Sequence, residues 1–552
     1  MNASLLMGMC VWVSNLINRC KDKGYFRLFQ IFSTKTVAMP FRHSFRVQKG
    51  AKNAASRRKG FTKYKKPHEN LDKRKIFAIF ASINTRIMNH FNKLSSIATV
   101  VIVLLSACAT KEQGQEAASA TEINDTNTPL HLMQPDYDTP YGVPQPAEIK
   151  AVMDCVLSYI SEGMPAAYDD SLRLVRGRFR LTSYECGVAY SAALSAYKIT
   201  GDSAYLHFVT DRANVLAELA PKVTDKIAAD PRFDSEMRRV LRPAALDDCG
   251  AMAASLIRLQ IQGQKNKAFE PMIARYMDFI VNKEYRLADG TYARNRPHHN
   301  TVWLDDMYMA IPALAWYGSY TGDVRYTNEA LRQLHLFKDK MWVPEVQLFR
   351  HGWVEGMTPH PNFHWGRCNG WAILTICEVL DNLPANHKER PFVLDLLRQH
   401  IEGLCRLQHQ SGFWHQLLDR NDTYLESSCT AIYTYCIAHA INEGWIDSLA
   451  YGAQVLLAWN AVTTCVNELG QVEKCCVGTG MGFDPAFYAY RPVHVMAFHG
   501  YGPTLWAGTE VIRMLNTTWP KMNDSAVHFY PSEQKTSEPI FSEDVSEGEI
   551  FG

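Results

Sequence analysis

A repeat of about sixty residues runs through the middle of this 552-residue chain and constrains its fold more than any other feature. The segments "AYKITGDSAY" and "GSYTGDVRY" share a TGDxxY turn, in which a glycine follows an apolar helical run. Similar breaks fall between and beyond these turns, at intervals of 62, 59, 60 and 62 residues. Each break joins two segments with apolar residues spaced by three and four, which is the pattern of amphipathic helices. The predicted helix ends are Gly201, Gly263, Gly322, Asn382 and Gly444.

Two further helical segments extend the repeat. The segment "GPTLWAGTEVIRMLN", which ends at Asn516, has the pattern of a sixth first helix, and "AEIKAVMDCVLSYISEG", near the start, is available as its partner. Six consecutive helical hairpins are expected to close into a barrel with an inner and an outer ring of helices. We therefore expect an all-α fold, an (α/α)6 barrel of six helical hairpins, over residues 146–518.

Polar side chains stand near the start of the first helix of each hairpin. If these first helices are parallel and form the inner ring, their starts meet at one mouth of the barrel. Ordinary helix capping would explain Asp and Ser at these places, but it would not explain Arg, Trp and Tyr at the same level. We therefore expect a functional site at this mouth. The polar residues are Tyr184, Glu185, Asp247, Asp248, Asp305, Asp306, Arg367, Asn369, Ser427, Ser428, His499 and the adjacent Gly500.

Charge divides the chain into two different parts. Residues 1–87 carry 19 Lys and Arg against 3 Asp and Glu, whereas the remainder has a net charge of −14. A body of that charge is poorly suited to nucleic acid, whose binding depends on neutralising phosphates, so no nucleic-acid partner is expected. The basic run "SRRKGFTKYKKPHENLDKRK" is an alternative nucleic-acid arm, but a signal sequence downstream disfavours this interpretation.

The segment from Met88 has the anatomy of a secretory signal. It has a short region with Lys93, an apolar run too short to span a bilayer, and small residues ending at Cys108. The sequence "LSAC" resembles the lipobox of bacterial lipoproteins, which implies cleavage before Cys108 and lipidation of this cysteine. We therefore expect 88–108 to be a lipoprotein signal peptide. The basic extension 1–87 is then either not translated, with Met88 as the true start, or not part of the mature protein.

The remaining boundaries follow from composition. Residues 109–145 are polar and are expected to form a flexible tether, and the acidic, Ser-, Glu- and Pro-rich residues 519–552 are expected to form an unfolded tail. The lipobox implies a protein anchored through lipid in a bacterial outer membrane or periplasm. The membrane is thus an expected partner, reached through the lipid.

The cysteines do not suggest a metal or disulfide framework. The chain has 14, of which Cys10, Cys20 and Cys108 precede the predicted barrel. The other 11 are scattered along apolar stretches with no CxxC pair, which is typical of small buried side chains. No metal and no cofactor is expected.

Aromatic residues gather in the same stretches as the polar motifs. Aromatic faces with polar groups between them are typical of carbohydrate sites, although aromatics alone are more often core. Arg367 offers a planar fork that matches a carboxylate, and together with His351 it suggests an acidic sugar. Two carboxylates facing one cleft are the usual equipment of glycoside hydrolysis. The aromatic residues are Trp303, Tyr308, Trp353, Trp365, Trp371 and Trp414.

Several motifs resemble a known family. The segments "TVWLDDMYMAIP", "HGW", "WGRCNGWAILTICEVL", "SGFWHQLLDRNDTYLESSCTAIYTYCIAHAI" and "HGYGPTLWAGTEV" look like those of the unsaturated rhamnogalacturonyl hydrolases, glycoside hydrolase family 105, related to the unsaturated glucuronyl hydrolases of family 88. The resemblance spans roughly residues 148–516 and implies a metal-free (α/α)6 barrel. Cys368 stands where the family pattern has Gly, which puts fine substrate preference in doubt but leaves Arg367 and Trp371 in place.

The resemblance also implies roles for individual residues. Asp305 matches the general acid/base, which requires that its pKa be raised by an apolar or anionic setting. Asp248 matches the second carboxylate, and Asp306 and Asp247 are assigned to helix capping because adjacent helical residues point about 100° apart. The expected substrate-binding residues are Tyr184, Met309, His351, Trp365, Arg367 and Trp371.

Three functions remain open on the sequence. The first is a hydrolase that removes a terminal 4,5-unsaturated galacturonyl residue from rhamnogalacturonan fragments by hydrating its C4=C5 bond. The second uses the same chemistry on unsaturated glucuronyl units from glycosaminoglycans or other anionic glycans. The third is a non-catalytic glycan-binding lipoprotein, which the presence of both Asp248 and Asp305 disfavours. In each case the partner is an acidic oligosaccharide.

Overall fold

The computed structural model describes residues 126–127, 141–522 and 527–532. The chain divides into two units, 1–121 and 122–552, and all the described residues belong to the second. The predicted basic extension, the signal peptide with Cys108 and most of the predicted tether therefore lie outside the described residues.

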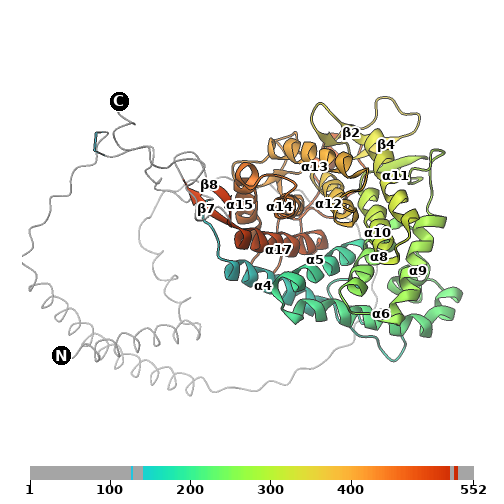
Figure 1. Ribbon diagram of the computed structural model, residues 1–552. Coiled ribbons are helices and arrows are strands. Elements are labelled where there is room, and N and C mark those ends of the chain that lie inside the picture. Colours follow the sequence, from blue (N-terminus) through green and yellow to red (C-terminus); the bar gives the residue numbers. More distant parts are fainter. Residues whose placement is uncertain (1–125, 128–140, 523–526, 533–552) are drawn as a thin grey trace, which may run out of the picture. The chain divides into compact units, whose positions relative to one another are not determined.

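Six helices form a closed inner ring (Figure 1). Each contacts the next in chain order, and the last contacts the first, which is the arrangement expected of a barrel. The predicted (α/α)6 fold is confirmed. The inner helices are α5 (Tyr184–Thr200), α8 (Leu246–Ile261), α10 (Asp305–Thr321), α12 (Gly366–Asn382), α14 (Ser427–Asn442) and α17 (Tyr501–Thr517).

An outer helix packs against each inner one. The helix α4 (Pro146–Gly163) contacts α17, so the first and last helices of the barrel close the ring as the sequence predicts. The other outer helices are α6 (Ser203–Ala229), α9 (Glu270–Asp278), α11 (Val324–Met341), α13 (Arg390–Cys405) and α15 (Ser448–Thr463). Shorter helical segments lie between them: α7 (Ser235–Leu241), η2 (Lys267–Phe269), η3 (Phe279–Lys283), α16 (Pro485–Ala489) and η4 (Phe498–Gly500).

The TGD turns join an inner helix to its outer partner. Gly201 and Gly322 have φ angles of 70° and 71°, a left-handed conformation that glycine adopts at low cost. The aspartate that follows each glycine, Asp202 or Asp323, accepts a hydrogen bond from the backbone N–H two residues on and caps the outer helix. The repeated motif therefore ends one helix and begins the next.

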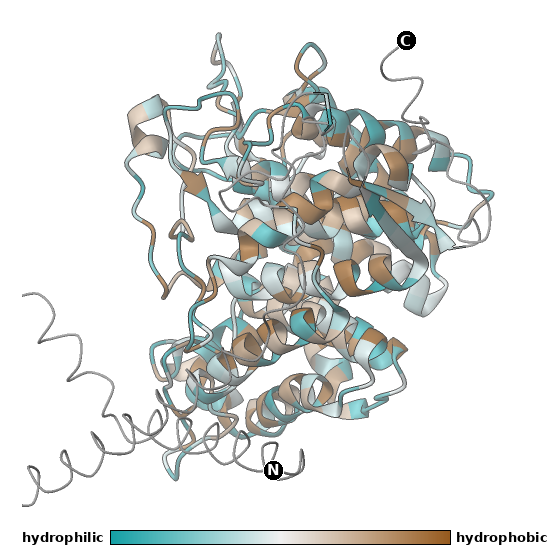
Figure 2. Cartoon of the chain, turned by 90° about the vertical axis from the view of Figure 1, so that its left-hand side faces the viewer, coloured by the Kyte–Doolittle hydropathy of each residue, from teal (hydrophilic) through white to brown (hydrophobic). Residues whose placement is uncertain are grey.

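The inner helices pack closely because small residues separate them. A Cβ atom on Gly250 of α8 would lie 1.6 Å from the Met309 carbonyl oxygen of α10, so only glycine fits at this crossing. Met309 itself is buried in this helix contact. Apolar residues pack between the helices, whereas polar residues dominate many of the outer loops (Figure 2). The ring is therefore a packed core, with the site confined to its end.

Three short antiparallel strand pairs lie between helices, at the ends of the hairpins. The pair β1 (Thr301–Trp303) and β4 (Gly352–Val354) joins the segment before α10 to the segment that carries His351. The others are β2 (Trp342–Val343) with β3 (Leu348–Phe349), and β5 (Trp414–His415) with β6 (Leu425–Glu426).

A fourth strand pair corrects the predicted C-terminal boundary. Strands β7 (Thr518–Met522) and β8 (Val527–Pro531) form a hairpin that packs on α15. The Phe529 side chain is fully buried, and the Ser448 hydroxyl of α15 donates a hydrogen bond to the Phe529 carbonyl oxygen at 2.6 Å. The prediction of an unfolded segment from residue 519 is wrong for these strands, because the short apolar stretch "VHFY" was hidden in an acidic composition. Residues 533–552 lie outside the described residues.

All 11 cysteines in the described part of the chain are free, and nine of them are buried. The interpretation of these cysteines as small buried side chains is confirmed. No helix within 126–127, 141–522 and 527–532 is long and apolar enough to cross a membrane.

Candidate active site

The starts of the inner helices come together at one mouth of the barrel. The pKa of the Tyr184 phenol, at the start of α5, is raised well above its usual range by burial and by the carboxylates of Glu185, Asp247 and Asp305, with Arg367 opposing them. Groups from the starts of four inner helices thus act on one side chain. The Tyr184 hydroxyl also forms a hydrogen bond with His499 Nε2, just before α17. The predicted convergence of the helix starts is confirmed for these residues.

Asp305 is the carboxylate with the most specific partner at this mouth. His351, from the segment between β3 and β4, places Nε2 2.9 Å from Asp305 Oδ2. The His351 side chain is 1% exposed and that of Asp305 is 14% exposed, so the pair is nearly closed to water while the carboxylate keeps one open side. Burial raises the pKa of Asp305, but His351, Arg294 and Arg367 outweigh burial and the pKa is lowered overall. The expectation of a raised pKa is wrong for the free protein, because three cationic or hydrogen-bonding neighbours face this carboxylate.

Asp306 and Asp247 share one buried arginine. Arg294 donates two hydrogen bonds to Asp247, at 2.8 and 2.9 Å, and its Nε donates to Asp306 at 2.8 Å. Burial raises the pKa of Asp306, although Arg294 opposes this change. Neither carboxylate caps its helix within the described structure, so the assignment of both to capping is wrong. They are instead the two partners of an ion-pair bridge between α8 and α10.

Asp248 is held by partners that precede α8 in the chain. Its carboxylate accepts hydrogen bonds from Arg238 at 2.8 Å and from the Ala244 backbone N–H at 2.9 Å, and forms an ion pair with Arg239 at 3.1 Å. Asp248 thus fastens α7 to the start of α8. Its neighbour Asp247, with 31% of its side chain exposed, takes the position toward the mouth. The predicted role of Asp248 as the second catalytic carboxylate stays a prediction.

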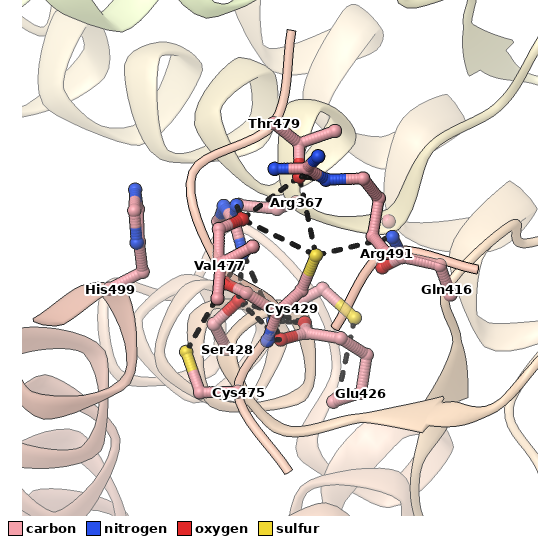
Figure 3. A network of polar contacts seen from close by, with 12 residues as sticks. Arg367, Gln416, Glu426, Ser428, Cys429, Cys475, Val477, Thr479, Arg491 and His499 are labelled. Atoms are coloured by element: carbon pink, nitrogen blue, oxygen red, sulfur yellow. Dashed lines mark hydrogen bonds and ion pairs between the residues drawn. The ribbon is translucent and has the colours of Figure 1, made fainter. Parts of the chain in front are cut away.

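Arg367 lies in a dense polar network beside the mouth (Figure 3). Its guanidinium donates to the carbonyl oxygens of Cys476 and Val477 at 2.8 and 2.7 Å and to the Ser428 hydroxyl at 3.2 Å. Glu426 lies 3.9 Å away and balances its charge. Arg367 therefore holds the 476–477 segment against α12 and α14. Its predicted contact with substrate stays a prediction.

Trp365 and Trp371 are buried in the packing around the mouth and do not present an open face to solvent. Trp371 stacks on Tyr308, with ring centres 5.1 Å apart, and meets Tyr184 edge-on. Trp365 lies between His351 and the Arg367 guanidinium, at 4.8 and 4.5 Å. Both tryptophans are 1% exposed. They fix the shape of the mouth and the direction of His351.

Sequence reasoning missed three contributors to this site. Tyr488 donates or accepts at His351 Nδ1, Arg294 bridges the two carboxylates, and Glu426 faces Arg367. Tyr488 lies in the long segment between α15 and α17, where no periodic pattern points to a position. The pairing of "HGW" with a downstream tyrosine could not be read from the sequence alone. No cluster of three or more His, Cys, Asp or Glu side chains suited to a metal ion occurs in the described residues.

The profile of Glycosyl Hydrolase Family 88 matches residues 163–515, which is more than half of the chain and nearly all of the barrel. The protein belongs to this family. This family 88 protein is therefore a glycoside hydrolase, and the mouth that holds Asp305 is its candidate active site.

Named relatives agree with the family. The protein is 24% identical over 350 residues to the unsaturated rhamnogalacturonyl hydrolase YesR of Bacillus subtilis, covering 62% of this chain and 93% of that one. It is 29% identical over 225 residues to the unsaturated 3S-rhamnoglycuronyl hydrolase of Formosa agariphila, covering 38% and 58%. A crystal structure from Salmonella enterica serovar Paratyphi A, described as a possible member of the GH105 family, aligns at a TM-score of 0.54 with 24% identity, covering 70% and 97%. The resemblance seen in the motifs is confirmed, and the structural likeness supports the barrel fold.

Proposed function

We propose that this family 88 enzyme removes a terminal 4,5-unsaturated galacturonyl residue from rhamnogalacturonan-derived oligosaccharides. The observation that carries the proposal is Asp305, a carboxylate with one open side, held by His351 at 2.9 Å in an aromatic mouth. The relative from Bacillus subtilis, which the chain covers over 93% of its length, is named for an activity of this kind.

The reaction proposed for this site is a hydration. Asp305 donates a proton to C4 of the enol ether, and its carboxylate then takes a proton from the water that adds at C5. The resulting hemiketal opens and leaves a hemiacetal at C1, which releases the linked sugar. The proton that Asp305 gives is thus restored by water, and no other reactant is needed.

Asp305 must be protonated before this first step. Its lowered pKa keeps it ionised in the free protein at neutral pH. A substrate carries its own carboxylate and displaces water, and both changes favour the protonated form of a nearby acid. We therefore expect binding of the uronate to raise the pKa of Asp305 toward the value that proton donation requires.

A cation for the substrate carboxylate is available at Arg296. Its side chain is 61% exposed, lies 3.8 Å from Asp247 and stacks over Trp303 at 4.7 Å. Arg294 and Arg367, in contrast, already donate to several acceptors of the chain. This exposed guanidinium supports an acidic oligosaccharide as the substrate.

The test is loss of the enol ether's ultraviolet absorbance with purified protein. Unsaturated galacturonyl-rhamnose is the expected best substrate, and the saturated disaccharide is the matched control. No loss of absorbance with any unsaturated uronyl disaccharide, by a protein with a cooperative melting transition, would overturn the proposal.

A second candidate substrate is an unsaturated glucuronyl unit. The relative from Formosa agariphila, named an unsaturated 3S-rhamnoglycuronyl hydrolase, favours it. The same assay ranks these substrates. The compounds compared are unsaturated glucuronyl-rhamnose, with and without a 3-sulfate, and glycosaminoglycan disaccharides. A higher kcat/KM on any of them than on the galacturonyl compound would replace the first candidate.

We also propose that the enzyme is a lipoprotein. The lipobox-like "LSAC" ending at Cys108 supports lipid attachment there, and the polar residues 109–145 would separate the lipid from the barrel. A bacterial outer membrane or periplasm is the proposed location. Lipid attachment at Cys108 requires that Cys108→Ser abolish membrane association.

A further inference from the structure

A tyrosine outside the barrel helices lies directly behind the proposed catalytic pair. Tyr488, in α16, is fully buried, and its hydroxyl lies 2.6 Å from His351 Nδ1. The other nitrogen of this imidazole, Nε2, lies 2.9 Å from Asp305 Oδ2. A continuous line of hydrogen bonds therefore runs from Asp305 through His351 to Tyr488.

A second contact of the Tyr488 hydroxyl fixes the direction of this line. The Gly482 backbone N–H lies 2.9 Å from the hydroxyl oxygen, and an N–H can only donate. An ionised Asp305 can only accept, so His351 must carry its proton on Nε2. A neutral imidazole then has a bare Nδ1, which accepts the Tyr488 proton at 2.6 Å. In this arrangement the three short contacts are satisfied and the Tyr488 proton is itself used in one of them.

The other protonation states fit less well. An imidazolium would donate from both nitrogens, and the Tyr488 proton would be left with the Gly482 carbonyl oxygen at 3.5 Å, a poor hydrogen bond. The opposite neutral tautomer would turn a bare Nε2 toward the Asp305 carboxylate, so two acceptors would face each other. The Tyr488 hydroxyl therefore selects the tautomer in which His351 donates to Asp305.

The segment that holds Tyr488 is itself tightly fixed. The Tyr488 ring contacts Phe363 and Trp365, with centres 5.3 and 6.3 Å away. A Cβ atom on Gly482 would lie 2.2 Å from the Phe487 ring, so the 482–488 turn closes only with glycine at its start. The hydroxyl is thus held at a defined point behind His351.

We propose that Tyr488 is a positioning residue, which fixes the Nε2–H tautomer of His351 and thereby keeps Asp305 aimed and charged until substrate arrives. The inference rests on the proposed function, since it gives Asp305 the proton-transfer role. Tyr488 itself does not touch the reacting atoms. It acts through His351, whose orientation and donor atom it sets.

The direct test of the tautomer uses the unmodified protein. The ring nitrogens of His351 are observed by nitrogen-15 NMR at neutral pH, and their signals are assigned by their absence in His351→Gln. A protonated Nε2 and a bare Nδ1 are expected. A protonated Nδ1 with a bare Nε2, or two protonated nitrogens, would overturn the proposal whether or not the enzyme turns over any substrate.

The kinetic test compares two tyrosines two residues apart. Tyr488→Phe keeps the ring and removes the hydroxyl, and Tyr490→Phe, at a side chain that is 86% exposed, is the control. We expect Tyr488→Phe to lower kcat about 10-fold or more, with KM changed less than about 3-fold, as for loss of one buried hydrogen bond. Because His351 then donates less reliably to Asp305, the limb of the pH–rate profile that reports Asp305 should move to higher pH.

A purely structural role gives a different result. It would lower the melting temperature and reduce the rate by one factor at every pH, without moving that limb. Such a result, or equal effects of Tyr488→Phe and Tyr490→Phe, would refute the positioning role. If the unmodified protein consumes no unsaturated uronyl disaccharide, the proposed function fails instead, and the NMR result still decides the tautomer.

Discussion

The two aspartates that begin α10 are held by partners of different kinds. Asp305 meets a histidine and keeps an open side, whereas Asp306 is 1% exposed and meets a guanidinium that it shares with Asp247. Asp305 has the access to substrate that a proton-transfer group needs. Asp306 is part of a buried ion pair, which contributes to stability only while both charges are present. The difference makes the two residues separable by mutation.

Asp305→Asn should preserve the fold and lower kcat by about 10²–10⁴-fold, because the amide cannot cycle a proton. Asp306→Asn should instead lower the free energy of unfolding by about 1–3 kcal/mol, because the amide oxygen replaces only part of the hydrogen bonding to the buried Arg294, whose charge Asp247 still balances. Activity per folded molecule should stay within a few-fold in Asp306→Asn. Kinetics on one unsaturated uronyl disaccharide and melting curves on both variants test this pair. Activity losses that merely follow unfolding in both would place the catalytic carboxylate elsewhere, with Asp247 the next candidate.

Glu284 should make stability depend on pH. Burial, helped by Asp306 and Asp247, raises its pKa from 4.5 to about 7, and its Oε2 has no hydrogen-bond partner among the described residues. The unfolded chain therefore loses the proton first, so the folded state becomes less stable as the pH rises from 4.5 and the loss levels off above 7. Relative to Glu284→Gln, the free energy of unfolding should fall by on the order of 2 kcal/mol between pH 5 and pH 8. Urea unfolding of both proteins at the two pH values gives the comparison, and parallel pH dependence would contradict it.

Single residues were predictable where the helix itself decides their direction. Asp305 and Asp306 differ by one helical step of about 100°, and the assignment of Asp305 to the mouth holds. At the other pair the sequence favoured Asp248, but Arg238 and Arg239 draw it toward α7 and leave Asp247 toward the mouth. A helical pattern says that two neighbours diverge. The pattern does not indicate on which side of the helix an arginine from a neighbouring segment lies.

At the scale of elements, the turns that repeat were predictable and the segments that occur once were not. TGDxxY combines a left-handed glycine with an aspartate cap, and both act within a few residues. Tyr488 and the β7–β8 hairpin depend on contacts with distant parts of the chain. Local chemistry can be recognised in a sequence, whereas a contact between distant segments leaves no spacing to recognise.

The β7–β8 hairpin should be a necessary part of the barrel. Phe529 fills a space beside Gly452 of α15, where an added Cβ would lie 2.5 Å from its ring. Phe529→Ala should therefore cost about 3–5 kcal/mol of stability, as for a buried aromatic in a close-packed site. Truncation after Ser532 is the control, and it should leave the melting temperature unchanged because the acidic residues beyond it are expected from the sequence to be unfolded. Equal melting temperatures for Phe529→Ala and the unmodified protein would show that the hairpin contributes little.

At the scale of the whole molecule, the period of about sixty residues was sufficient to predict the architecture. Each helical hairpin leaves one apolar face uncovered, so the stable arrangement is a closed ring in which every inner helix has two inner neighbours and one outer partner. The ring then places all the inner helix starts at one end. The position of the site follows from the repeat, although its detailed partners do not.

The proposed lipid attachment at Cys108 would bind the molecule as a whole to a membrane. The residues after 87 carry a net charge of −14, so attraction to anionic lipid gives them no affinity for a bilayer and attached acyl chains would have to supply it, at about 0.8 kcal/mol per buried CH₂. Expression of the Cys108→Ser protein from Met88 should move it from the membrane fraction to the soluble fraction and abolish labelling by radioactive palmitate. Its kcat per folded molecule should be unchanged, because Cys108 precedes the first barrel helix at Pro146 by a long polar segment.

The Cys155→Ser protein, altered at a free cysteine within the barrel, controls for loss of a thiol. A Cys108→Ser protein that remains with the membranes, or an unmodified protein that takes up no label, would refute the lipid anchor and leave the enzyme's location to be found by other means.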